Sequence, residues 1–126
     1  AILVAVTGGA DYSNVERVYE RLDHYHKTLR FTHLLHGGNL GLDTIADSWC
    51  DTKSGVQSVM CRAHRERDGK DGGIMRNSMV ALLRPTVLLA FPGGAITKNM
   101  RTTCRAFGIR VIAIDAKRTR NMSQII

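Results

Sequence analysis

Residues 86–94 read Thr-Val-Leu-Leu-Ala-Phe-Pro-Gly-Gly, an apolar run that a proline and two glycines bring to an end. A short, wholly apolar run bounded by turn residues is typical of a strand that is buried on both faces of a parallel sheet. The glycines are followed by a segment of helical period, residues 97–107, which ends at Gly108. This order of strand, glycine turn and helix predicts one unit of an α/β fold.

The same order recurs along the rest of the chain. Besides residues 86–91, strands are expected at 2–6, 32–36, 56–61 and 109–114, and helices at 14–29, 43–53, 73–83 and 97–107. Five strands with helical crossovers predict a Rossmann-like α/β fold, an open parallel sheet of about five strands with helices on both faces. A single domain is expected over residues 1–115, followed by a C-terminal tail over 116–126.

Three details of this pattern are expectations that the structure can test. Ser13 or Asn14 is expected to cap the first helix. The polar residues 62–71 have neither period and are expected to form a loop. The helix over 73–83 is expected to stop at Pro85, and its apolar residues are Ile74, Met75, Met79, Leu82 and Leu83.

Composition is that of a soluble globular domain, with 44% hydrophobic and 23% charged residues among 126. No stretch is apolar for long enough to cross a bilayer, and residues 1–6 read as a buried strand rather than a signal peptide. Cys50, Cys61 and Cys104 lie far apart, which disfavours a zinc site or a disulfide framework and favours a reducing, cytoplasmic location. We expect no metal and no cofactor.

A net charge of +7 and a pI near 9.8 predict attraction to polyanions. The partner can be nucleic acid or a phosphorylated small molecule, and the basic residues can also simply form a solvated surface. Few aromatic residues accompany the basic clusters, so stacking platforms for single-stranded nucleic acid are not evident.

Glycines follow three of the expected strands directly. Parallel strands present their carboxyl ends at one sheet edge, where glycine admits a ligand close to the backbone and a helix N-terminus offers N–H groups to an anion. The alternative is that these glycines only make tight turns. The expected phosphate-binding residues are Gly8, Gly9, Gly37, Gly38, Gly41, Pro92, Gly93, Gly94 and Thr97.

Four motifs in this order resemble the SLOG superfamily, named for the Smf/DprA and LONELY GUY proteins, and within it the small YspA-like proteins. The resemblance implies a Rossmann-like domain that binds a nucleotide-derived molecule, with Arg76 facing the cleft, and a homo-oligomer. The motifs are Val6-Thr7-Gly8-Gly9 with Asp11-Tyr12, His36-Gly37-Gly38 with Gly41 and Asp43, Arg76-Asn77 with Met79, and Phe91-Pro92-Gly93-Gly94 with Thr97 and Met100.

Four side chains in these motifs each have two interpretations. Arg76 can clamp a phosphate or be an exposed helix arginine. Asn77 can bond a ribose or base, or tie down the adjoining loop. Asp43 can accept from a sugar hydroxyl or cap the following helix, and Thr97 can likewise cap a helix or bond a phosphate.

The chain also departs from the patterns that it resembles. LONELY GUY enzymes use an arginine and a glutamate after the last glycine loop to cleave an N-glycosidic bond, whereas Asn99 and Met100 stand at the glutamate positions here. Ile96 replaces a glycine, which is expected to reshape that loop, and Ala10 replaces an arginine. The leading interpretation is therefore binding, for sensing or processing, of a nucleotide-derived, phosphate-bearing molecule.

Two alternatives remain open at this stage. The first is a nucleotide or sugar-nucleotide hydrolase in which Arg76 steadies phosphate and Asp43 or Asp11 transfers the proton. The second is single-stranded nucleic-acid binding, which the charge suggests.

Overall fold

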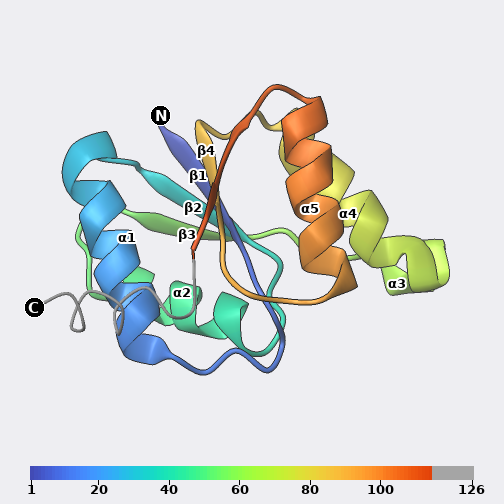
Figure 1. Cartoon of the computed structure of the whole chain (residues 1–126), viewed down its shortest axis with the longest axis horizontal. Helices are drawn as coiled ribbons and strands as arrows, with labels where there is room; N and C mark the ends of the chain where they lie inside the picture. The colour runs from blue at the N-terminus through green and yellow to red at the C-terminus, as the bar shows by residue number, and fades with distance from the viewer. Residues whose placement is uncertain (115–126) are drawn as a thin grey trace, which may run out of the picture.

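The computed structural model describes residues 1–114. Strands and helices alternate along nearly the whole of this range (Figure 1). The elements in chain order are β1 (Leu3–Thr7), α1 (Val15–Leu29), β2 (His33–His36), α2 (Leu42–Cys50), β3 (Gln57–Met60), α3 (Arg65–Asp68), the 3-10 turn η1 (Gly69–Asp71), α4 (Gly72–Leu82), β4 (Val87–Ala90), α5 (Ala95–Ala106) and β5 (Arg110–Ala113).

The five strands form one open sheet in the order β3-β2-β1-β4-β5, and every neighbouring pair is parallel. Strand β4, which lies within the apolar run 86–91, pairs with β1 and β5 and is buried along its whole length. The expected Rossmann-like α/β fold is confirmed. The expected tail over 116–126 lies outside the described residues.

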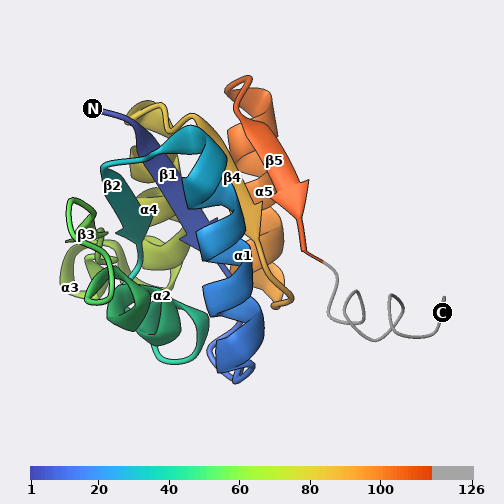
Figure 2. The same cartoon turned by 90° about the vertical axis from the view of Figure 1, so that its left-hand side faces the viewer.

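Alternate residues of each central strand face opposite layers of helices. Val4 and Val6 of β1 pack with α1 and α2, whereas Ala5 packs with α4 and α5. Leu34 and Leu35 of β2 divide in the same way, since successive strand side chains point to opposite faces. In Figure 2, α1 and α2 lie on the near side of the sheet and α4 and α5 lie beyond it.

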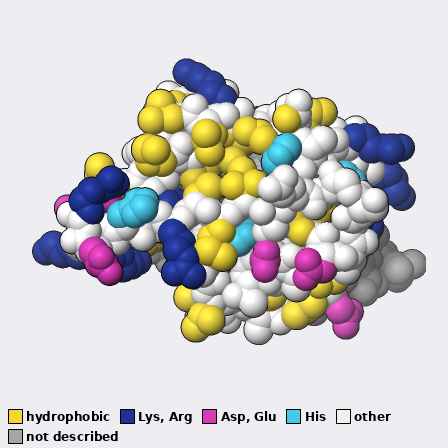
Figure 3. Space-filling model, turned by 180° about the vertical axis from the view of Figure 1, so that it is seen from behind, with side chains coloured by type: hydrophobic (Ala, Val, Ile, Leu, Met, Phe, Trp, Pro, Cys, Tyr) yellow, Lys and Arg dark blue, Asp and Glu magenta, His cyan; other side chains and the backbone are white. Residues whose placement is uncertain are grey.

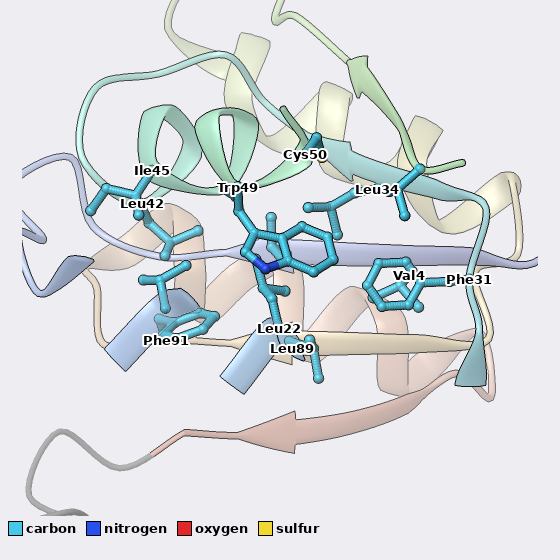
Figure 4. Close-up of a cluster of buried hydrophobic side chains, with 14 of the residues drawn as sticks. Val4, Leu22, Phe31, Leu34, Leu42, Ile45, Trp49, Cys50, Leu89 and Phe91 are labelled. Atoms are coloured by element: carbon cyan, nitrogen blue, oxygen red, sulfur yellow. The ribbon is translucent and has the colours of Figure 1, made fainter. Parts of the chain in front are cut away.

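Trp49 of α2 lies at the centre of the hydrophobic layer between the sheet and helices α1 and α2 (Figure 4). The side chain is completely buried, its ring centroid lies 5.6 Å from that of Phe31, and its indole N–H donates to Asp23 of α1 at 3.0 Å. One residue therefore joins the C-terminal end of α2 to α1 and to the segment that leads into β2.

The structure settles one alternative at α1 and corrects the interpretation of residues 62–71. Asn14 caps α1, because its side chain accepts from the N–H of Arg17 at 3.0 Å. Residues 62–71 were expected to form a loop, which is wrong, since α3 and η1 lie within them. These short helices bury no side chain and so leave no hydrophobic period in the sequence.

The helix that follows the last glycine loop also starts earlier than expected. Helix α5 begins at Ala95, and Ile96 lies in its first turn instead of in a loop. Within residues 1–114 no helix has the length and apolarity needed to span a membrane. The three cysteines are free thiols, and burial raises the pKa of Cys50 and Cys104 to about 11.

Candidate functional site

The glycine loops meet at the point where the strand order reverses. The chain runs outward from β1 to β2 and β3, then returns to the other side of β1 to form β4 and β5. The loops after β1 and β4 therefore diverge from adjacent strand ends toward helices on opposite faces of the sheet. This divergence leaves a crevice of the kind in which open α/β proteins bind ligands.

Backbone hydrogen bonds join the first glycine loop to its neighbours. The N–H of Gly9 donates to Pro92 O at 2.9 Å, and the N–H of Leu42 donates to Gly9 O at 3.1 Å. A Cβ on Gly8 would lie 2.6 Å from Leu42 Cγ, and one on Gly41, whose φ is +75°, would lie 2.4 Å from Gly9 O. Gly8 and Gly41 are thus required for close packing between the loops.

In the last glycine pair, Gly93 is closely packed and Gly94 faces open space. A Cβ on Gly93 would lie 2.3 Å from the hydroxyl of Thr97 and 2.8 Å from the amide nitrogen of Gly9, whereas one on Gly94 would meet nothing within 4 Å. Gly94 occupies the N-cap position of α5, and Thr97 is buried in the first turn. The expected capping role of Thr97 is therefore wrong, and the N-terminus of α5 is accessible through Gly94.

Arg76 is the buried cation of the crevice, with 8% of its surface exposed. It lies on the inner side of α4, donates from Nε to Asn77 Oδ1 at 2.9 Å and from Nη1 to Cys61 O at 3.4 Å. Burial lowers the pKa of its guanidinium, and the nearby Asp43 carboxylate opposes that shift. The interpretation as an exposed helix arginine is thus wrong.

Asn77 holds the base of the site instead of lining it. Its side chain is completely buried and donates from Nδ2 to Ile96 O at 3.1 Å and to Asn99 Oδ1 at 3.0 Å. With the bond from Arg76, the amide ties α4 to the first turn of α5. Of its two interpretations, the structure supports the loop-tying one.

Asp43 lies in the first turn of α2 and is 6% exposed. Its Oδ2 accepts from the backbone N–H groups of Gly37 and Asn39, both at 3.2 Å. Burial raises the pKa of this carboxyl, while those two bonds and the charge of Arg76 act against the rise. The N-cap position of α2 belongs to Gly41, so the expected capping role of Asp43 is wrong.

These groups surround a cavity of about 450 Å³ at the carboxyl edge of the sheet. Seven of the expected site residues line it: Gly8, Gly9, Gly37, Asp43, Arg76, Gly94 and Thr97. The other five, Gly38, Gly41, Asn77, Pro92 and Gly93, lie behind the lining or beside it, and Pro92 and Gly93 instead border a neighbouring hollow with Asp11.

Arg65 and His36 also line the cavity. His36 was the one histidine expected to reach the ligand, whereas Arg65 was not among the expected site residues. Arg65 is an exposed residue at the start of α3. Because α3 has no hydrophobic period, the sequence did not predict this helix or the position of Arg65 beside the cavity. His36 ends β2, which placed it close to the ligand edge in the sequence. Its Nδ1 accepts from the N–H of Gly38 at 3.1 Å, so Nε2 carries the proton and donates to Ser58 at 2.7 Å.

The charges of the lining are unbalanced. Arg65 and Arg76 are its arginines, and Asp43 is its only carboxylate among the described residues. Helix α5 adds no acid, since Met100 lines the floor and Asn99 bonds Asn77 and Thr103. Within residues 1–114 no cluster of three histidine, cysteine or carboxylate side chains is arranged to hold a metal ion.

The chain is similar in sequence to one protein family and to a phage protein. The family model of the YspA, cpYpsA-related SLOG family matches residues 2–67, which include the first two glycine loops and Asp43. The Gene 61 protein of Mycobacterium phage D29 is 31% identical over 121 residues, covering 90% of this chain and 97% of that protein. No solved structure matches the chain.

Proposed function

The chain belongs to the YspA, cpYpsA-related SLOG family, and from that membership and the cleft's geometry we propose that it binds a nucleotide-derived small molecule through a phosphate. The observation that carries the proposal is the convergence of Gly9, Gly37, Gly94 and Arg76 on one cavity at the switch point of the sheet. The cavity volume, about 450 Å³, lies within the range of small-molecule sites.

The phosphate is assigned to the N-terminus of α5. The first N–H groups of a helix have no intrahelical acceptor, and the helix dipole favours an anion there. Gly94 leaves open space in front of this turn, and Gly9 and Thr97 line the same part of the cavity. The N-terminus of α2 is less accessible, because the N–H of Leu42 already donates to Gly9 O.

Arg76 supplies the second anchor. Its guanidinium is held at Nε by Asn77 and at Nη1 by Cys61 O, so its position is set before a ligand arrives. A buried arginine with an incompletely balanced charge attracts an anion strongly, since the surrounding protein screens it less than water does.

A hydrolase is the second candidate, and Asp43 is the observation that favours it. Burial raises the pKa of this carboxyl, which is the direction of shift that favours a proton donor. Asp43→Asn keeps an oxygen that can accept from Gly37 and Asn39. Loss of turnover with retained binding in this variant would support the hydrolase, and unchanged turnover would exclude Asp43 as its acid.

A thermal-shift screen tests the binding proposal. Nucleoside monophosphates, cyclic nucleotides, NAD and ADP-ribose are each added to wild type, Arg76→Ala and the control Arg105→Ala, which removes an exposed arginine on the last turn of α5. A ligand at 100 times its Kd stabilises the fold by about 2.7 kcal/mol. We expect one class of nucleotide to raise the Tm of wild type and Arg105→Ala, but not of Arg76→Ala.

Two other results of the screen would decide against the proposal. If no compound raises the Tm of wild type, the cleft is not a nucleotide site. If Arg76→Ala responds as wild type does, the ligand binds elsewhere. The three free thiols suit the reducing, cytoplasmic setting that we propose for this binding.

A further inference from the structure

His36 is a buried histidine whose two ring nitrogens are both engaged. It ends β2, and only 3% of its surface is exposed. Its Nδ1 accepts from the N–H of Gly38 at 3.1 Å, and its Nε2 donates to Ser58 Oγ of β3 at 2.7 Å. The ring lines the cavity but offers a ligand no free nitrogen, so its role there is to hold neighbouring groups in place.

The hydrogen bonds that pass through His36 all point in one direction. Ser58 donates in turn to Asp47 Oδ1 of α2, and that oxygen lies 3.6 Å from His36 Nε2. The chain of bonds thus runs from the Gly38 amide, through the imidazole and the serine hydroxyl, to a carboxylate whose side chain is 53% exposed. This alignment favours the tautomer in which Nδ1 is an acceptor.

Three consecutive amides of the loop after β2 are held by buried side chains. The N–H groups of Gly37 and Asn39 donate to Asp43 Oδ2, and the N–H of Gly38 between them donates to His36. Gly38 has a φ of +74°, so this loop follows a backbone path that few other residues adopt. The path of this wall of the cavity therefore depends on His36 remaining a hydrogen-bond acceptor.

We propose that protonation of His36 releases this loop and thereby weakens ligand binding at acid pH. An imidazolium donates from both nitrogens, so its Nδ1–H would face the N–H of Gly38 with no acceptor between them. The amide must then turn away, which moves Gly37 from its close fit beside the Arg76 guanidinium. The effect on the ligand rests on the proposed function, whereas the release of the loop does not.

The surroundings of the ring can accommodate its charged form. The titratable and charged groups around it are Asp43, Asp47 and Cys50 of α2, Cys61 after β3, Arg65 of α3 and Arg76 of α4. Burial raises the pKa of both thiols, so they stay neutral where histidine titrates. Asp47 would attract the imidazolium through Ser58, and the carboxylate of Asp43 offsets the arginines. Protonation therefore breaks the bond to Gly38 without leaving an isolated buried charge.

NMR of the ligand-free protein between about pH 8 and about pH 5, the range in which histidine ordinarily titrates, tests the release of the loop. Long-range ¹⁵N–¹H spectra of the ring report the protonation of His36, and solvent exchange of the Gly38 amide reports the bond. We expect the protection of this amide to fall at least about 10-fold as His36 gains its proton. Gly55 and Gly108, at the opposite edge of the sheet, are the control amides. A Gly38 amide that stays protected while His36 titrates, or a ring that stays neutral throughout, would overturn the proposal.

His36→Asn is the matched variant, because its Oδ1 can accept from Gly38 but does not titrate. The Gly38 amide should stay protected across the whole range, and a loss like that of wild type would overturn the proposal. If His36→Asn does not fold, Asp47→Asn replaces it, since it changes a half-exposed side chain. Without that carboxylate the loss of protection should move to lower pH by up to about half a unit. An unmoved transition would contradict the proposal.

Titration calorimetry with ADP tests the consequence for binding. Between about pH 7.5 and about pH 5.5, wild type should lose about 10-fold more affinity than His36→Asn, which corresponds to one lost hydrogen bond. The comparison cancels the titration of the phosphate and of Asp43, because both proteins share them. Equal losses would overturn the effect on the ligand. Absence of ADP binding at both pH values would instead contradict the proposed function, and the NMR result alone would then decide whether the loop is released.

Discussion

Gly37 is the residue on which the position of Arg76 depends most directly. A Cβ at this position would lie 1.8 Å from Arg76 Nη1 and 3.0 Å from the Asp43 carboxylate. The absence of a side chain here therefore allows the guanidinium to sit beside the loop that follows β2. Gly8 likewise has no room for a side chain, because it packs against Leu42.

Gly37→Ala is expected to destabilise the fold by about 1–3 kcal/mol, the usual cost of overpacking a filled interior. The cost should fall sharply when Arg76→Ala is introduced as well, because the clashing atom is then gone. Urea unfolding of the two single variants and the double variant measures this coupling. Additive costs would show that Gly37 does not act through Arg76.

Asp43 should make stability depend on pH. Its pKa in the folded chain is raised above the value of about 3.9 in an unfolded chain. The folded state then binds this proton more tightly, so the carboxyl's contribution to stability is complete below about pH 3.9 and is lost as the pH rises through the folded pKa. The Tm of wild type relative to Asp43→Asn should fall over that interval. A constant difference, or one that grows in favour of wild type, would contradict the raised pKa.

Seven of the twelve site residues expected from the sequence line the cavity, but the sequence could not choose among their roles. Asp43, Asn77 and Thr97 each had two interpretations, because a polar side chain beside a helix start can cap the helix, tie a loop or meet a ligand. Only the geometry distinguishes these roles, since Gly41 and Gly94 occupy the N-cap positions.

At the scale of elements, α3 brings an arginine to the mouth of the cleft. Arg65 lines the main cavity and also the adjoining groove of about 530 Å³, whose other charged or titratable residues are Arg62, His64, Glu66 and Arg67. Arg67 pairs with Asp68 at 3.1 Å, whereas no ion pair involves Arg65 within the described part of the chain. The mouth of the cleft is therefore positively charged.

Arg65→Ala should weaken binding of a nucleoside diphosphate more than that of a monophosphate, because only the longer ligand extends from α5 to α3. The expected loss is about 10-fold, which corresponds to one exposed charge-assisted contact. Titration calorimetry with ADP and AMP measures it, and Arg67→Ala is the matched control on the same helix. Equal loss for both nucleotides would place Arg65 at the first phosphate instead.

Elements with a buried face were predictable because their hydrophobic pattern is clear, and elements without a buried face were not. The apolar run of β4 and the spacing of Val18 and Leu22 in α1 identify a strand and a helix directly. Helix α3 has four residues and no buried face, so only its turn geometry defines it. Ile96 was expected to reshape a loop, but Ala95 and Ile96 continue the helix backward by two residues.

At the scale of the whole molecule, the charge of +7 is a property of the surface as well as of the cleft. Single-stranded oligonucleotides should bind weakly at low salt and dissociate as salt rises, through the release of counterions. This binding should not respond to Arg76→Ala, whose side chain is buried. Fluorescence anisotropy across a salt series tests both points, and tight binding that Arg76→Ala abolishes would favour nucleic acid as the cognate ligand.

The fold class followed from the alternation of strands and helices, while two global features did not. The strand order depends on the side of β1 on which each later strand is added, and no residue pattern in this chain specifies that side. The outward position of Ile74, Met75, Met79 and Leu82 on α4 was equally hidden, because apolar residues at helical spacing usually face the sheet. Figure 3 shows hydrophobic side chains gathered on the face of the molecule seen from behind.

The most direct test of the central claim is to follow the backbone amides of the glycines by ¹⁵N–¹H NMR during titration with ADP. The account predicts that Gly9, Gly37 and Gly94 shift together, while Gly55 and Gly108, which precede β3 and β5 at the opposite edge of the sheet, stay in place. Saturating ADP that leaves those three amides unmoved, or moves Gly55 and Gly108 equally, would contradict a nucleotide site in this cleft.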